Sequence, residues 1–135
     1  MNLQPRLKSV EKMMKKKFWS TRLNSFYYAA RGIIYFFNEG VHAKIHGIAT
    51  IIVVSTGFYF KISRNEWLAL LLSCALVLCA EAINTAIEKL TDMVSPGHHK
   101  QAEFVKDVAA GAVLIAAIFA VVIGLIIFIP KISMI

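Results

Sequence analysis

Several kinds of residue are scarce in this 135-residue sequence, and each scarcity excludes a class of site. The chain has only two cysteines, Cys74 and Cys79, which would lie ~140° apart on a helix, so neither a mutual disulfide nor a metal site is expected from them. The seven glycines form no P-loop or other glycine-rich phosphate cradle. Any nucleotide must therefore be held by charges, a metal and loop contacts.

Acidic residues are also scarce. Eight Asp and Glu stand against fifteen Lys and Arg, which gives a formal net charge of +7. The basic residues flank long apolar runs and do not form a stripe with a recognisable nucleic-acid motif. We therefore expect no nucleic-acid partner, and contact with anionic lipid headgroups accounts better for the charge.

Apolar residues are abundant. They make up 58% of the chain, and the mean hydropathy of +0.64 is higher than the largely polar surface of a small soluble domain allows. Three runs are long enough to cross a bilayer core, at 45–62, 67–90 and 108–129. Since backbone groups cannot remain unpaired in lipid, each run is predicted to be helical.

The first 44 residues have a different pattern. The basic stretch "KSVEKMMKKKF" precedes "LNSFYYAARGIIYFF", in which apolar residues share an arc of ~120° on a helix. This favours a helix that lies in the membrane interface. A cleaved signal peptide is the alternative, but Asn24, Ser25 and Arg31 interrupt the apolar residues and no small-residue cleavage site follows. The expected fold is an all-α membrane protein of one domain, 1–135, with an interfacial helix and three transmembrane helices.

The placement of charge predicts the orientation of the chain. Nine of the fifteen Lys and Arg precede the first apolar run, and three more, Lys89, Lys100 and Lys106, lie at the end of the second run or between the second and third. By the positive-inside rule, the N-terminus and the 90–107 loop are cytoplasmic.

The second run carries a polar face in an apolar setting. Glu81, Asn84, Glu88 and Asp92 fall within ~80° of one helix face. Ionisable residues in a membrane usually mark a functional site or a buried partner. One alternative is that Glu81 and Asn84 only bond neighbouring helices, and another is that Asp92 is only an interfacial charge.

Lys106 and Asp107 stand where the chain re-enters the membrane. Lys106 can meet phosphate as a point charge, whereas Asp107 can hold a metal, accept a hydrogen bond, or cap the third transmembrane helix. Carboxylates that can bind Mg²⁺, a nearby lysine and a deeper carboxylate are the parts that phosphoryl transfer to a lipid hydroxyl requires.

These residues carry a family resemblance. "EAINTAIEKLTD" followed by "KDVAAGAVL" resembles the signature of the prokaryotic integral-membrane diacylglycerol kinase and undecaprenol kinase family, from about Ser25 to Phe128. The resemblance implies a homotrimer with sites shared between subunits, in the bacterial cytoplasmic (inner) membrane. It also implies roles for individual residues: Glu81 as catalytic base, Glu88 as metal ligand, and Asn84, Glu88, Lys106, Asp107, Tyr28 and His99 on the nucleotide side.

The sequence departs from this family at one position. A second metal-binding glutamate is usual after the interfacial helix, but Gly40 stands there, with Glu39 one residue earlier. Either Glu39 reaches the metal through a local shift, or the metal site is altered. The nearby His42 and His46 are interpreted as interfacial polar residues.

The sequence thus predicts an ATP- and Mg²⁺-dependent kinase of a membrane lipid alcohol, with diacylglycerol and undecaprenol as candidate acceptors. Two alternatives remain open. One is a small proton-coupled transporter, which would also place a carboxylate in the membrane. The other is a catalytically altered family member that acts as a membrane assembly protein.

Overall fold

The described part of the chain is helical almost throughout. The computed structural model describes the backbone of residues 4–97 and 99–133, and the side chains of residues 21–22, 24–97 and 99–133. The helices are α1 (Gln4–Glu39), α2 (Val41–Tyr59), α3 (Arg64–Val94) and α4 (Lys100–Ile132). No strand occurs among these residues, and the all-α prediction is confirmed.

Three of these helices, α2, α3 and α4, are long and apolar enough to cross a membrane. The prediction of three spans in a multi-pass membrane protein is therefore confirmed, although their ends differ from the expected ones. The first span begins earlier, directly after Gly40, and ends at Tyr59 rather than at residue 62. Lys61 has a left-handed φ of 50°, which belongs to a tight turn and not to a continuing helix.

The chain divides into two compact units, residues 1–38 and 39–135. The first unit contains the basic stretch and the predicted interfacial segment. The interfacial segment is helical, as predicted, and the basic stretch belongs to the same helix, α1. Within it, Arg31 donates a hydrogen bond of 2.6 Å from Nη2 to the hydroxyl of Tyr35. Its position in the membrane interface stays a prediction.

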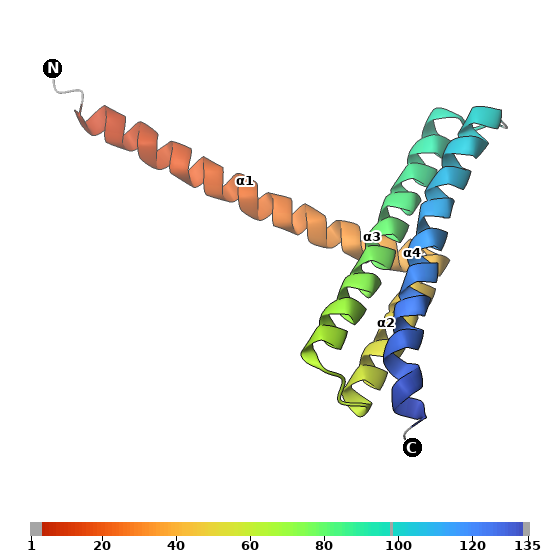
Figure 1. Cartoon of the computed structure of the whole chain (residues 1–135). Helices are drawn as coiled ribbons and strands as arrows, with labels where there is room; N and C mark the ends of the chain where they lie inside the picture. Colours follow the sequence, from red (N-terminus) through yellow and green to blue (C-terminus); the bar gives the residue numbers. More distant parts are fainter. Residues whose placement is uncertain (1–3, 98, 134–135) are drawn as a thin grey trace. The chain divides into compact units, whose positions relative to one another are not determined.

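The second unit is held together by packing at one end. Figure 1 shows α3 and α4 lying side by side, joined by a short turn. A cluster of buried side chains fills the opposite end of the pair, away from that turn: Ile62, Leu70, Ile127 and Phe128. The rings of Phe60 and Phe128 lie 6.1 Å apart, within the range of favourable aromatic contact. This cluster fixes α2, α3 and α4 at the end that is distant from the polar residues of α3.

An ion pair reinforces this end of the bundle. Ser63 and Glu66 form a capping box at the start of α3, in which each side chain bonds the other residue's backbone N–H. The backbone hydrogen bond from Ser63 holds the pKa of Glu66 below its usual range, with a further contribution from Lys131. Lys131 Nζ lies 3.1 Å from Glu66 Oε1, which ties the start of α3 to the end of α4.

A close approach at Gly57 gives a testable prediction. A Cβ at this position would lie 2.9 Å from Cη2 of Trp67, so Gly57→Ala forces the indole ring to move. Overpacking of this kind destabilises by roughly 1–3 kcal/mol. We expect the unfolding temperature in detergent to fall for Gly57→Ala. Gly97→Ala is the control, because nothing lies within 4 Å of its Cβ position, and equal unfolding temperatures for the two variants would contradict the prediction.

Candidate functional site

The polar face of α3 opens into a cavity. Glu81 and Asn84 are only 4% and 6% exposed, and Glu88 is half-buried. The spacing of three and then four residues brings them to one face of the helix. All three line the same cavity of about 310 Å³, so the structure brings these predicted site residues together.

The other walls of this cavity come from α2 and α4. His42 and His46 face it from α2, whereas α4 contributes only apolar side chains. The sequence analysis interpreted both histidines as interfacial residues and missed their place at the site. Their spacing of four residues was the available signal, because it puts both rings on one face of α2.

One buried polar atom of a residue that lines this cavity has no hydrogen-bond partner. Asn84 Nδ2 donates a hydrogen bond of 3.4 Å to Glu88 Oε1, whereas Asn84 Oδ1 is buried without a partner. Buried polar atoms are usually paired, so an unpaired one calls for an explanation. Among the described residues, neither Glu81 nor Asn84 bonds to another helix. Bonding between the helices of one chain therefore does not explain this polar face.

Lys106 and Asp92 join the site at its rim. Lys106 Nζ lies 2.8 Å from Asp92 Oδ1, across the gap between α4 and α3. This hydrogen bond raises the pKa of Lys106 above its usual value, and the charges of Asp92 and Glu88 act in the same direction. Asp92 thus pairs with the ammonium group that was predicted to meet phosphate, and its own side chain is exposed.

Asp107 follows Lys106 but does not cap the helix. Because α4 begins at Lys100, Asp107 lies in its third turn, and the N-cap is His99. The capping alternative for Asp107 is therefore wrong. Its side chain is exposed, so it remains accessible to a ligand at the membrane surface.

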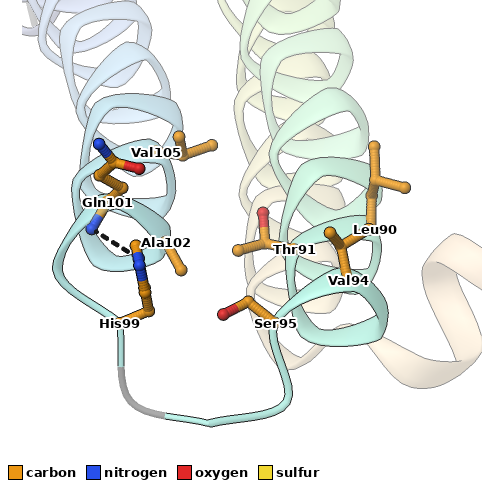
Figure 2. Close-up of a pocket in the computed structure, with 8 residues that line it drawn as sticks. All are labelled: Leu90, Thr91, Val94, Ser95, His99, Gln101, Ala102 and Val105. Atoms are coloured by element: carbon orange, nitrogen blue, oxygen red, sulfur yellow. Dashed lines mark hydrogen bonds between the residues drawn. The ribbon is translucent and has the colours of Figure 1, made fainter.

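His99 lies in a second cavity, at the turn between α3 and α4. This cavity of about 370 Å³ is lined by the end of α3 and the start of α4. Figure 2 shows the hydroxyl of Ser95 pointing across the turn towards His99. His99 Nδ1 accepts a hydrogen bond of 3.3 Å from the backbone N–H of Gln101, which leaves Nε2 to carry the proton in the neutral ring. His99 can thus donate to a ligand at the turn, but it does not line the Glu81 cavity.

Glu39 forms an ion pair with Lys89. Glu39 Oε2 lies 3.2 Å from Lys89 Nζ, and both side chains are largely exposed. The backbone at Gly40 is extended, with φ −83° and ψ 116°, so the helical register assumed in comparing positions 39 and 40 is interrupted there. No cluster of three or more His, Cys, Asp or Glu suited to a metal occurs among the described residues. The remaining predicted residue, Tyr28, belongs to the first unit.

An apolar groove adjoins the Glu81 cavity. It has a volume of about 320 Å³, is formed by α2, α3 and α4, and is lined by residues such as Val53, Leu70 and Val121. His46 and Ala117 line both spaces. The polar cavity thus continues into an apolar groove of the kind that suits a hydrocarbon chain.

The sequence of this chain is similar to those of known lipid kinases. The profile of the prokaryotic diacylglycerol kinase family matches residues 27–128. An undecaprenol kinase of Bacillus subtilis is 37% identical over 107 residues, which cover 79% of this chain and 87% of the relative. A diacylglycerol kinase of Synechocystis sp. is 35% identical over 118 residues, covering 84% and 67% respectively. A diacylglycerol kinase of Escherichia coli K12 is 32% identical over 76 residues, covering 56% and 62%.

The Lys106–Asp92 pair predicts a pH effect on stability. A lysine whose pKa is raised by folding stabilises the fold below its unfolded pKa, and this contribution disappears as the pH rises through the folded pKa. Asp92→Asn removes the main cause of the shift. We expect the difference in unfolding temperature between wild type and this variant to be present at neutral pH and to vanish in strongly alkaline solution. A difference that is independent of pH up to that range would show that Asp92 acts by packing alone.

Proposed function

This chain belongs to the prokaryotic diacylglycerol kinase family and is a lipid kinase, and we propose that it transfers the γ-phosphoryl group of ATP to a lipid hydroxyl at the cytoplasmic membrane face. The observation that carries this proposal is the buried Glu81, which lines a cavity together with Asn84, whose Oδ1 is buried without a hydrogen-bond partner. A carboxylate in such a place is suited to act on a ligand that enters the cavity. The family assignment favours this activity over the transporter alternative.

Glu81 is the proposed general base. As the lipid oxygen bonds to the γ-phosphorus, the hydroxyl proton passes to the Glu81 carboxylate and ADP departs. The apolar groove beside the cavity supports this role, because a hydrocarbon chain lying there brings its hydroxyl end to Glu81. Diacylglycerol and undecaprenol are both candidate acceptors.

The residues around Glu88 fit a magnesium ion. Mg²⁺ prefers oxygen ligands and usually takes one or two carboxylates together with phosphate oxygens. Glu88 offers a carboxylate, and the hydrogen bond from Asn84 Nδ2 orients it. When bound there, the ion would neutralise the charge on the transferring phosphate.

The nucleotide would lie above Glu88, towards the turn between α3 and α4. Lys106 supplies an ammonium group whose raised pKa keeps it charged, and phosphate would compete with Asp92 for it. Asp107 is exposed on the next position of α4, and His99 offers Nε2 at the turn. We propose Tyr28 as a further nucleotide contact from the N-terminal helix.

The whole chain, 1–135, is proposed to act as one lipid-kinase domain that assembles into a homotrimer in the bacterial inner membrane. The charge distribution supports a cytoplasmic N-terminus and a cytoplasmic 90–107 loop, since eleven of the fifteen Lys and Arg lie in these two regions. Both the Lys106–Asp92 pair and the His99 cavity would then face the cytosolic nucleotide pool.

The direct test is a phosphorylation assay with γ-labelled ATP and purified protein in mixed micelles, with diacylglycerol and undecaprenol offered separately. Transfer of label to either lipid supports the proposal and identifies the acceptor. Failure to label either lipid, with folded protein and excess Mg²⁺, would refute it.

Glu81→Gln should abolish phosphoryl transfer while ATP binding stays nearly intact. The amide cannot take a proton, and loss of a general base usually lowers the rate by ~10²- to 10⁴-fold. Turnover and equilibrium ATP binding are measured on the same preparations. If the variant keeps more than about a third of wild-type turnover, far above that range, Glu81 is not the base.

Variants at Glu39 and Gly40 test whether the metal site is altered. Because Glu39 is paired with Lys89, we expect Glu39→Ala to be nearly silent, whereas Glu88→Ala should abolish activity or raise the Mg²⁺ requirement. Gly40→Glu should lower the Mg²⁺ requirement and quicken turnover, and the extended backbone at this position accepts any side chain. Turnover is measured against Mg²⁺ for each variant. A Glu39→Ala variant as impaired as Glu88→Ala would show instead that Glu39 binds the metal.

A further inference from the structure

The proton that Glu81 removes needs a way out of the cavity. A general base must return to its carboxylate form before the next turnover. Only 4% of the Glu81 surface is exposed, so direct exchange with bulk water is restricted. Another group on the cavity wall would therefore speed the removal of the proton.

Two imidazoles line the α2 wall of the same cavity. His46 is half-buried, whereas His42 is exposed. They lie four residues apart and hence on one helix face, ~6 Å apart along the axis. The pair therefore leads from the interior of the cavity to its rim.

The remaining walls offer no equivalent group. From α3, Glu81 and Glu88 face the cavity, and Glu88 is hydrogen-bonded by Asn84. The α4 residues that line it are apolar, and Lys106 acts on Glu88 from the rim while bonded to Asp92. Among the described lining residues outside α3, only the two histidines carry a side chain that can both accept and donate a proton.

We propose that His46 and His42 form the path by which the proton leaves Glu81, an inference that rests on the proposed kinase function. The lipid O–H bond breaks as its oxygen bonds to the γ-phosphorus, the bond from that phosphorus to the bridging oxygen of ADP breaks, and Glu81 holds the proton. Glu81 then gives the proton to a neutral ring nitrogen of His46, directly or through water. His46 passes it to His42 and His42 to the outside water, which restores all three groups.

The size of the cavity is consistent with this path. Its volume of about 310 Å³ greatly exceeds the ~10–15 Å³ that one water needs on this kind of measure. Water can therefore occupy the space between the α2 and α3 walls beside a lipid headgroup. His46 also borders the apolar groove, so it stands where the lipid hydroxyl would enter.

The test compares kcat from pH 5.5 to 8.5 for wild type and for His46→Ala, His46→Gln and His42→Ala, with Ser55→Ala as control. Ser55 is an exposed α2 residue whose hydroxyl bonds only the Ile51 carbonyl, at 2.8 Å. We expect kcat to fall about tenfold or more for His46→Ala, and less for His42→Ala, with the KM for ATP within about twofold of wild type. Added imidazole should restore kcat of His46→Ala, and Ser55→Ala should match wild type.

A double variant separates proton transfer from packing. If His46 acts through Glu81, Glu81→Gln with His46→Ala should be no slower than Glu81→Gln alone. A His46→Ala kcat within about twofold of wild type at every pH, a range too small for acid–base catalysis, would overturn the path while leaving the kinase function intact. A loss that imidazole does not restore and that multiplies with Glu81→Gln would also overturn it, in favour of packing. Undiminished turnover of Glu81→Gln would instead refute the proposed base.

Discussion

The placement of Glu81 governs the arrangement of the other parts of the site. A charged side chain at the centre of a transmembrane helix disfavours insertion by roughly 2.5–3.5 kcal/mol even on lenient scales, so it must face protein or water rather than lipid. Here it faces a cavity between helices, with Asn84 and Glu88 on the same face of α3. This requirement fixes the rotation of α3 about its axis and determines which face packs against α2 and α4.

Packing and polarity are separated along the bundle. The cluster around Leu70 and Phe128, the capping box and the Glu66–Lys131 pair all lie at one end. The carboxylates, the histidines and the Lys106–Asp92 pair lie towards the other. Because the first end holds the three helices together, the second can keep an open cavity without loss of the fold. An opening of this kind suits a lipid kinase, because its two substrates must meet at one site.

Local patterns in the sequence predicted the helices and the face of α3 correctly. The three apolar runs identified the spans, and the spacing of Glu81, Asn84 and Glu88 identified the cavity wall on which they lie. The partners of these residues depend on how helices pair, which periodicity within one helix does not contain. For this reason the His42 and His46 wall and the Lys89–Glu39 pair were not predicted. The misplaced start of α4, which suggested a cap at Asp107, arose because hydropathy marks the apolar segment and not the helix end.

The helices of the second unit differ in length. With ~1.5 Å of rise per residue, the 19 residues of α2 span ~28 Å, close to the thickness of a bilayer core, whereas the 31 residues of α3 and the 33 of α4 exceed it. In a thicker membrane α2 is too short to span the apolar core. The longer α3 and α4 can still span it, by changing their tilt or by moving their terminal turns into the core. The histidine wall then shifts relative to the carboxylate wall. Under the proposed proton path, turnover is therefore expected to depend on the thickness of the host bilayer, because the two walls must stay aligned.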